Sequence, residues 1–345
     1  MDIKNKFLAT GIGSLPFTDV AKAVEFILLS FKNHIPYWPQ LPRLSFLESM
    51  HVQYCQGFPG LTLDLSRKNA YVDTQKGSFM DEFEKCYDAI NNKHLDYFSV
   101  GKDYAAGLYE FIKGIKAADF NFIKGQVIGP ISFGMTLLDE KKRPLIFNKE
   151  LVEIIPQFLS LKANWQIAEL KKATKSQIIM FIDEPYLVAI GTNQFAGLDS
   201  SAIKSQINTV ADVIRAEGAL AGIHCCGNTD WSVILESNID ILSFDAFGFM
   251  DNLLIYKDSL NKFIKRGGVI AFGIVPNRED YDLSDFIKRY FKLLLSKGNF
   301  LLKNGALITP SCGCGTVSEN FARQVHSFSI DLAERLKSQK TIESA

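Results

Sequence analysis

The chain has 345 residues, of which 47% are hydrophobic and 22% charged, and its 38 basic residues balance 38 acidic residues. This apolar content is enough for a large core and excludes a disordered chain. The lack of net charge excludes a general attraction to nucleic acid or to an anionic membrane. We therefore expect a globular enzyme with a small-molecule substrate, and neither nucleic acid nor membrane as a partner.

The N-terminal sequence MDIKNKFLATGIGSLP lacks the apolar stretch of a signal peptide, and no later segment has about 18 uninterrupted apolar residues. These features predict a cytoplasmic protein. Cysteines in that reducing compartment are not expected to form disulfides, yet four of the six lie in two tight clusters, Cys225 with Cys226 and Cys312 with Cys314. The clustering is the first indication of a functional site.

Short apolar runs alternate with longer amphipathic segments along the whole chain, a pattern typical of repeated β–α units. Eight strands are predicted, over residues 7–12, 35–38, 122–128, 177–182, 219–223, 239–244, 268–273 and 305–308. Helices are predicted over residues 18–31, with Thr18 as a candidate N-cap, and over residues 152–173, 201–216 and 283–295.

Eight strands with helices between them predict an α/β fold of the single (β/α)8 TIM-barrel type. An open doubly wound sheet is the alternative, but no GxGxxG sequence follows the first strand to support a dinucleotide fold. Residues 56–100 are too long for one connection and contain turn residues throughout. We expect one domain over residues 1–345, with an insertion at about 56–100 near the active-site mouth.

The sequence IHCCGN follows the fifth predicted strand and places His224 and Cys226 two residues apart. Side chains at this spacing project to the same side of an extended segment, so an imidazole and a thiolate can converge on one ion while Cys225 faces away. After the eighth predicted strand, TPSCGCGT offers Cys312, with Cys314 as the alternative. Active sites of barrels lie where the carboxyl ends of the strands meet, so both segments are expected to reach one site.

Asp245 ends the sixth predicted strand in ILSFDAF and is expected at the same face. Three nitrogen and sulfur ligands with a weaker oxygen or an open position are typical of a catalytic Zn²⁺ ion, which can hold a thiol substrate as a thiolate. Two interpretations without metal compete with this one. The cysteines can be buried structural thiols, or they can form a redox pair, although neither HCC nor CxC has the usual CxxC arrangement.

Four motifs, GIGSLP, FIDEP, HxC followed by DILSFD, and PSCG, resemble the catalytic half of cobalamin-independent methionine synthase, within the uroporphyrinogen decarboxylase-like barrel superfamily. The resemblance extends over residues 10–335. It implies a zinc-dependent methyltransferase that delivers a methyl group to the sulfur of homocysteine, with zinc bound by His224, Cys226, Asp245 and Cys312. The family has Glu at the place of Asp245, so the shorter side chain leaves the fourth ligand loose or bridged by water.

The same motifs suggest contacts with a substrate. Gly13 and Ser14 of GIGSLP end the first predicted strand, where the hydroxyl and backbone N–H groups can bind a carboxylate. Asp183 of FIDEP closes another strand and is expected to bind an amino group and to act in catalysis. Ser14 as a turn residue and Asp183 paired structurally with Glu184 are the alternatives. Gln40 stands where the family's second carboxylate is expected, and we expect it to contact the substrate there. Because an amide replaces the carboxylate, another thiol, such as coenzyme M, stays open as the acceptor.

The family also carries a histidine after the seventh strand that protonates the departing folate nitrogen, whereas this chain has FGIVPNRED there. A folate amine leaves poorly without a proton, so methylcobalamin carried by a corrinoid protein is the expected methyl donor, ahead of methyltetrahydrofolate. Two alternatives stay open. One is a uroporphyrinogen decarboxylase-like lyase on the same barrel, and the other is a non-catalytic barrel that binds metal or corrinoid.

Overall fold

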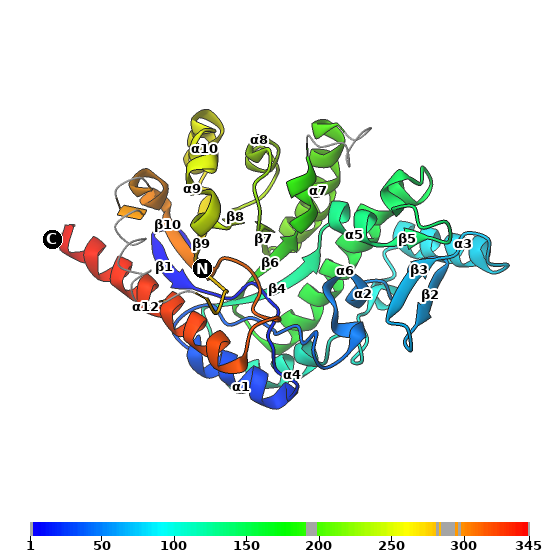
Figure 1. The fold of residues 1–345 in the computed structure, drawn as a ribbon, viewed down its shortest axis with the longest axis horizontal. Coiled ribbons are helices and arrows are strands. Elements are labelled where there is room, and N and C mark those ends of the chain that lie inside the picture. Colours follow the sequence, from blue (N-terminus) through cyan, green and yellow to red (C-terminus); the bar gives the residue numbers. More distant parts are fainter. Residues whose placement is uncertain (1–2, 191–198, 281–282, 284–293, 296–297, 344–345) are drawn as a thin grey trace.

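A seven-stranded parallel sheet forms the centre of the molecule, a computed structural model that describes residues 3–190, 199–280, 283, 294–295 and 298–343. The strand order is β1-β10-β9-β8-β7-β6-β4. The sheet curls, and helices lie around its outside (Figure 1). Its strands are β1 (Lys6–Ala9), β4 (Phe122–Ile128), β6 (Gln177–Asp183), β7 (Leu220–Cys225), β8 (Ile241–Phe244), β9 (Val269–Val275) and β10 (Gly305–Pro310).

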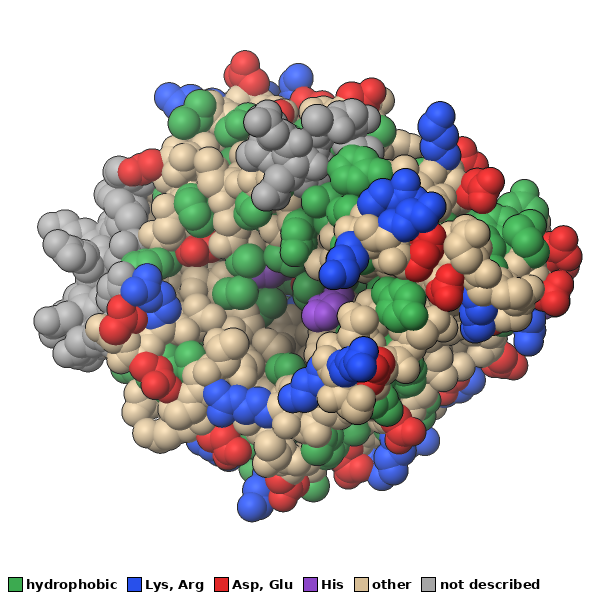
Figure 2. Space-filling model, turned by 45° about the vertical axis from the view of Figure 1, so that its right-hand side comes forward, with side chains coloured by type: hydrophobic (Ala, Val, Ile, Leu, Met, Phe, Trp, Pro, Cys, Tyr) green, Lys and Arg blue, Asp and Glu red, His purple; other side chains and the backbone are tan. Residues whose placement is uncertain are grey.

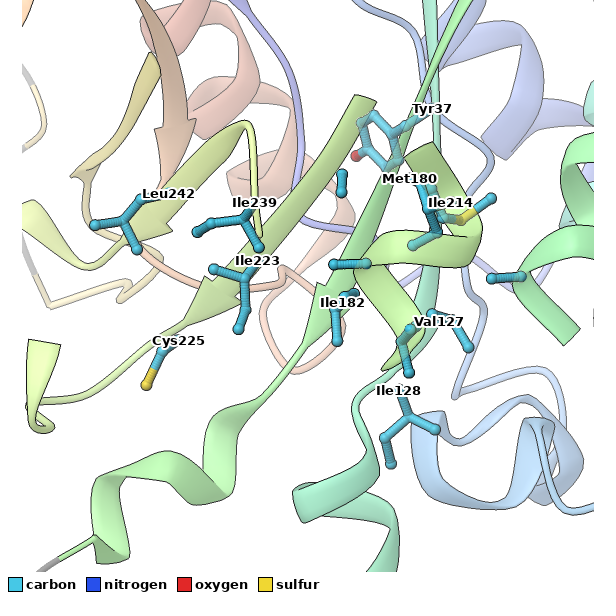
Figure 3. Packing of buried hydrophobic residues seen from close by; sticks show 14 of the residues in the cluster. Tyr37, Val127, Ile128, Met180, Ile182, Ile214, Ile223, Cys225, Ile239 and Leu242 are labelled. Carbon is cyan, nitrogen blue, oxygen red and sulfur yellow. The ribbon is translucent and has the colours of Figure 1, made fainter. Parts of the chain in front are cut away.

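Successive residues of each strand pack on opposite faces of this sheet. In one row, Val127, Ile182, Ile223 and Leu242 are adjacent in register on β4, β6, β7 and β8, and they belong to the large core that the helices share (Figure 3). Alternate residues, among them Phe181, belong to a smaller apolar cluster on the concave face. Because apolar groups cover both faces, these strands are apolar along most of their length.

The two edge strands, β1 and β4, are linked by the segment 35–40. The Ile35 N–H donates to the Ala9 carbonyl (3.1 Å) on one side, and the Lys124 N–H donates to the Pro36 carbonyl (2.8 Å) on the other. The predicted strand 35–38 nevertheless forms only isolated bridges. Pro36 and Pro39 offer no N–H groups, which limits regular pairing. The fold is thus α/β with a curled parallel sheet. It does not show the regular closure into an eight-stranded barrel that the sequence predicts.

Seven of the eight predicted strands are confirmed, and β4 has the predicted bounds. The predicted helices 152–173 and 201–216 correspond to α6 (Leu151–Ala173) and α7 (Ser200–Ala216), while most of the predicted helix 283–295 lies outside the described residues. Thr18 is not the N-cap of the first helix: Asp19 holds that position and its Oδ1 accepts from the Lys22 N–H (3.0 Å). The carboxylate also suits the positive end of a helix dipole.

The helices are α1 (Val20–Ser30), α2 (Met50–Gln53), α3 (Phe79–Asn91), α4 (Ala106–Ile115), α5 (Pro130–Thr136), α6 (Leu151–Ala173), α7 (Ser200–Ala216), α8 (Trp231–Leu235), α9 (Ala246–Leu254), α10 (Lys257–Lys265) and α12 (Glu319–Glu343). The long helix α12 packs against β1 and β10, and α6 packs against α7. Within the described part of the chain, no helix combines the length and the apolar character needed to span a membrane.

Residues 56–100 fold into structure of their own. Strands β2 (Leu61–Asp64) and β3 (Asn69–Val72) form an antiparallel pair, and β3 also pairs with the short strand β5 (Leu138–Asp139). This small sheet and α3 lie at one end of the molecule, at the right of Figure 1, far from β9 and β10. The division into one domain with an insertion stays a prediction.

Candidate metal centre

Three polar residues share one row at the carboxyl ends of neighbouring strands. Asp183 is adjacent in register to His224, and His224 to Ser243. All three are buried. The Nδ1 atom of His224 lies 2.9 Å from the Ser243 hydroxyl oxygen, a contact that orients the imidazole ring. The other ring nitrogen, Nε2, is buried and has no hydrogen-bond partner among the described residues, so it is available to a ligand.

Cys226 and Cys312 form a cluster with His224. Cys226 follows the last residue of β7, and Cys312 lies just beyond β10. One possible ligand atom from each of the three residues lies within 4.8 Å of the other two. Ligand atoms about 2.0–2.3 Å from a tetrahedral zinc ion lie less than about 4 Å apart. A buried imidazole nitrogen without a partner beside two thiols therefore fits Zn²⁺ in its donor chemistry, and the three atoms lie near enough to converge on one ion if they move slightly together.

The two thiols of this cluster differ in their acidity. A hydrogen bond from Cys312 lowers the pKa of Cys226, and His224 acts in the same direction, whereas the contact with Cys226 raises the pKa of Cys312. The pair thus favours one thiolate and one thiol that share a proton. Because the thiolate is the form that binds metals, Cys226 is already prepared as a ligand, and a bound cation would displace the proton from Cys312.

The neighbouring cysteines lie outside this cluster. Cys225 is fully buried in the core on the other face of the sheet, as the alternation of the strand predicts (Figure 3). Cys314 is also packed in the apolar core, where burial raises its pKa to about 12. The structure therefore brings Cys312, rather than Cys314, to His224.

Asp245 also lies outside the three-residue cluster. It is the N-cap of α9, and its Oδ1 accepts a hydrogen bond from the Gly248 N–H at 2.8 Å. Burial raises its pKa to about 6, and the negative charge of Cys226 contributes to that rise. The carboxylate is thus close enough to interact electrostatically with the cluster, while its role as a fourth ligand stays a prediction.

A pocket of about 400 Å³ opens beside the cluster. The face in Figure 2 is hollowed near its middle, and histidine side chains lie in and beside the hollow. The volume is in the range of small-molecule sites. The pocket is lined by Ile12, Ser14, Gln40, Pro42, Glu48, Ser49, Met50, His51, Asp183, Pro185, His224, Cys226, Asn277, Cys312, Gly313, Gly315 and Thr316.

The loop that contains Cys312 packs closely on the loop that contains Ser14. The Cys314 N–H donates to the Ser14 carbonyl (2.9 Å), and the Gly315 N–H donates to the Ser14 hydroxyl (3.3 Å). A Cβ atom at Gly313 would lie only 2.1 Å from the Ser14 hydroxyl oxygen. Glycine at 313 is therefore required for this approach, which holds Cys312 over the pocket.

Two further predicted substrate contacts, Gly13 and Gln40, also lie together. Gln40 lines the pocket, and its amide donates to Gln53 Oε1 at 2.8 Å. A Cβ atom at Gly13 would lie 2.7 Å from Gln40 Oε1, so the absence of a side chain at Gly13 makes room for that amide. Of the predicted substrate-binding residues, Ser14, Gln40 and Asp183 thus line the pocket, and Gly13 leaves room for the Gln40 side chain.

Asp183 lines the pocket, and one of its carboxylate oxygens has no hydrogen-bond partner among the described residues. This atom, Oδ1, is buried. Burial raises the pKa of Asp183 to about 6, and the nearby ammonium of Lys124 opposes that rise. Lys124 is itself fully buried, and its Nζ donates to the Ile12 carbonyl (2.6 Å) and to Gln126 Oε1 (3.3 Å). A buried carboxylate oxygen of this kind is a strong acceptor for a ligand's donor group.

Glu184, the neighbour of Asp183, is occupied elsewhere. Its carboxylate accepts hydrogen bonds from the Ile131 N–H (3.0 Å), the Ser132 N–H (2.8 Å) and the Ser132 hydroxyl (2.7 Å) at the start of α5. Within the sequence FIDEP, one carboxylate thus faces the pocket and the other holds a helix in place.

Several residues of the site were not anticipated from the sequence. His51, which stands alone in the sequence, lines the pocket, and Asn277 does so from the end of β9. Asn277 Nδ2 also donates to the Gly313 carbonyl at 2.8 Å. Its position after a predicted strand was a usable signal, because polar residues at the carboxyl ends of parallel strands face such sites. Ser243 and Lys124 lie within strands, where no local pattern distinguishes them from core residues.

Comparisons with known proteins do not identify a family for this chain. No protein-family model matches the chain, and no curated protein matches it. Among solved structures, the chain is similar to a GH20 catalytic module of the pneumococcal exo-β-D-N-acetylglucosaminidase StrH, with 12% identity and a TM-score of 0.49. The match covers 95% of this chain and 84% of that module. At this level the likeness assigns no activity to the chain.

The resemblance to cobalamin-independent methionine synthase and the uroporphyrinogen decarboxylase-like superfamily must be corrected, since no family model and no curated protein of either family matches the chain, and the solved structure to which it is similar is a GH20 module. The thiol methyltransferase function was inferred from that resemblance and is wrong on the same findings. The physical reason is that the motifs are short. Strings such as GIGSLP and FIDEP describe a strand that ends in a turn with polar residues, a local feature that any parallel α/β fold with a site at its strand ends can contain.

Proposed function

We propose that the protein is a zinc-dependent enzyme that acts on a small polar molecule bound in the pocket at the carboxyl ends of β6, β7 and β10. The observation that carries the proposal is the cluster of His224, Cys226 and Cys312, with ligand atoms within 4.8 Å of one another, beside a pocket of about 400 Å³. Three protein ligands leave a coordination position open, as in catalytic zinc sites, whereas structural sites are closed by four.

Zinc is the metal that the donor set favours. Imidazole and thiolate donors select Zn²⁺ over the hard cations Mg²⁺ and Ca²⁺, which prefer oxygen ligands. When bound, the ion supplies Lewis-acid chemistry to the group that fills its open position. Ser243 contributes by fixing the His224 ring through Nδ1, so that Nε2 points to the site.

We assign Asp183 the role of binding the hydrogen-bond donors of the substrate. The free oxygen of Asp183 accepts a hydrogen bond from a hydroxyl or amino group of the bound molecule, and the carboxylate can hold a proton during the reaction. Ser14 and Gln40 also line the pocket and offer a hydroxyl and an amide to the rest of the molecule. The substrate is accordingly a small molecule with several polar groups.

The position of the site supports a finer assignment of the fold as well. Every ligand lies at or just beyond the carboxyl end of a parallel strand, which is where (β/α)8 barrels carry their active sites. The segment 35–40 bonds to both edge strands. We therefore interpret the curled sheet as a barrel of this kind in which that segment takes the place of one strand.

Glycoside hydrolysis, the activity of the StrH enzyme, is not transferred to this chain. The likeness to that module, at 12% identity and a TM-score of 0.49, is too weak to carry an activity. The corrinoid partner and the methylcobalamin donor depended on the methionine synthase resemblance, and they stay untested predictions.

The test is the metal content of the purified protein, measured by elemental analysis after purification without chelators. We expect about one zinc ion per chain in the wild type, and loss of that zinc in both Cys226→Ser and Cys312→Ser. Cys225→Ala and Cys314→Ala are the matched controls, since each changes a neighbouring cysteine that packs in the core. A wild-type protein without zinc, or zinc that survives in both ligand variants, would refute the proposal.

A further inference from the structure

A second cavity lies at the opposite ends of the strands from the metal centre. It has a volume of about 360 Å³ and is lined by residues that precede or begin β1, β7, β8 and β9. The metal cluster, by contrast, lies beyond the carboxyl ends of β7 and β10. No residue is shared between the linings of the two cavities. The second cavity is therefore a separate site, of a size that holds a small ligand.

The charged residues of this cavity are mostly basic. Lys4, Arg215 and Arg266 contribute three positive charges, and Asp240 contributes one negative charge. Asp240 is already engaged, because its Oδ2 accepts from the Ala221 N–H (2.9 Å) and its Oδ1 lies 3.5 Å from Arg215 Nε. Basic side chains thus outnumber acidic ones in this lining, in a chain whose net charge is zero.

Arg266 is held at the cavity by groups that do not neutralise it. Its guanidinium donates to the Ser237 carbonyl (2.5 Å) and to the Ile239 carbonyl (3.3 Å), and it lies over the Phe263 ring, 5.1 Å from the ring centroid. Burial and the neighbouring charge of Arg215 lower the pKa of Arg266, and the charge of Asp240 opposes them only in part. The arginine is thus fixed in position next to a second cation, and an anion bound between the two would stabilise both.

Lys4 reaches the same cavity because of a glycine. Gly267 has a φ angle of +95°, and a Cβ atom there would lie 2.5 Å from the Lys4 ammonium nitrogen. Any other residue at this position would be strained and would push the lysine away. The sequence RGG at residues 266–268 therefore places one cation and makes room for another.

We propose that this cavity binds the phosphate group of a small molecule, with Arg215, Arg266 and Lys4 as its partners. Guanidinium groups form paired hydrogen bonds with phosphate oxygens, and an ammonium group adds a point charge. Sites that act on substrate lie at the other end of the strands, so the phosphate compound is a second ligand of this protein and is distinct from the molecule at the metal centre.

The experiment is isothermal titration calorimetry of the full-length protein with inorganic phosphate, at low ionic strength. We expect saturable binding with a Kd below about 1 mM, weakened at least tenfold by Lys4→Met and by Arg266→Met. Arg67→Met is the matched control, because Arg67 is an exposed arginine outside the cavity, on the turn between β2 and β3. Lys4 has an exposed side chain, so its variant remains informative if loss of the Arg266 contacts destabilises the fold.

Cys226→Ser separates this proposal from that of the metal centre. Phosphate binding that is unchanged in Cys226→Ser, and weakened in the two cavity variants, supports the cavity even if the protein contains no zinc. Binding that disappears in Cys226→Ser and persists in Lys4→Met and Arg266→Met would show that phosphate goes to the metal centre and would overturn the inference. The absence of saturable binding to the wild type would overturn it as well.

Discussion

His224 and Ser243 stand side by side on β7 and β8, with His224 Nδ1 2.9 Å from the Ser243 hydroxyl oxygen. The strand register makes this contact, since the two positions are paired neighbours whose side chains point to the concave face of the sheet. A histidine that binds metal through one ring nitrogen commonly uses the other for a contact of this kind. The pair therefore links the fold to the chemistry proposed for the site.

Substitution of Ser243 by alanine should weaken zinc binding without unfolding the protein. The variant removes the partner of His224 Nδ1, so the ring loses the contact that sets its orientation, and the affinity should fall roughly 10- to 100-fold. Competition with a zinc chelator measures the change. Ser329→Ala is the control, because that buried hydroxyl donates to the Val325 carbonyl in α12, away from the site. Equal zinc affinity in both variants would argue against the assigned role.

Gly313→Ala should disturb the metal site through a steric clash that a second substitution relieves. The new Cβ atom would lie 2.1 Å from the Ser14 hydroxyl oxygen, so either that hydroxyl turns away and loses its bond from the Gly315 N–H, or the loop that carries Cys312 moves, and the zinc affinity should fall roughly tenfold. Ser14→Ala removes the clashing oxygen, and the double variant should recover most of the affinity. A double variant as weak as Gly313→Ala alone would mean that the glycine serves another purpose.

The sequence predicts features that depend on local patterns. The bounds of β4 are correct because its seven residues form one buried run, and His224 and Cys226 come to the same side because a strand alternates with a period of two. The proximity of Cys312 follows from the rule that the ends of parallel strands meet. In each case the relevant information lies in a few neighbouring residues or in a general property of parallel sheets.

Other features depend on contacts between distant parts of the chain and could not be predicted in this way. The pairing of Ser243 with His224 requires the register of β8 against β7, and burial of Lys124 requires knowledge of what fills the concave face. The segment 35–40 contains apolar residues like a strand, but its prolines allow only isolated bridges. The family assignment was wrong for a related reason: short motifs record local geometry and not common ancestry.

Glu184→Gln should destabilise the fold. The carboxylate accepts three hydrogen bonds at the start of α5, whereas a glutamine amide has only one oxygen and turns an N–H₂ group toward donors. Buried donors left without partners cost about 1–3 kcal/mol in the free energy of unfolding. Urea denaturation measures this loss. Glu169→Gln, which alters an exposed ion pair with Lys172, should cost less than about 1 kcal/mol, and an equal effect of the two would contradict the prediction.

Protonation of His326 should make stability fall in mild acid. The ring is buried against Phe26, Phe31 and Tyr37, its Nδ1 lies 2.6 Å from the Ala322 carbonyl, and its Nε2 lies 2.7 Å from the Tyr37 hydroxyl. The carbonyl can only accept, so Nδ1 carries the hydrogen and Nε2 accepts from Tyr37. Burial lowers the pKa of His326 from 6.5 to about 4, because a charged imidazole loses its hydration there.

The sign of the effect follows from that lowered pKa. Between about pH 6.5 and pH 4 the unfolded chain binds a proton at His326 and the folded chain does not, so the stability present above pH 6.5 is lost as the pH falls toward 4. The loss is on the order of 3 kcal/mol. Urea unfolding at a series of pH values should show a shallower acid dependence for His326→Gln, whose amide can still accept from Tyr37. An unchanged slope in His326→Gln would show that other groups cause the acid sensitivity.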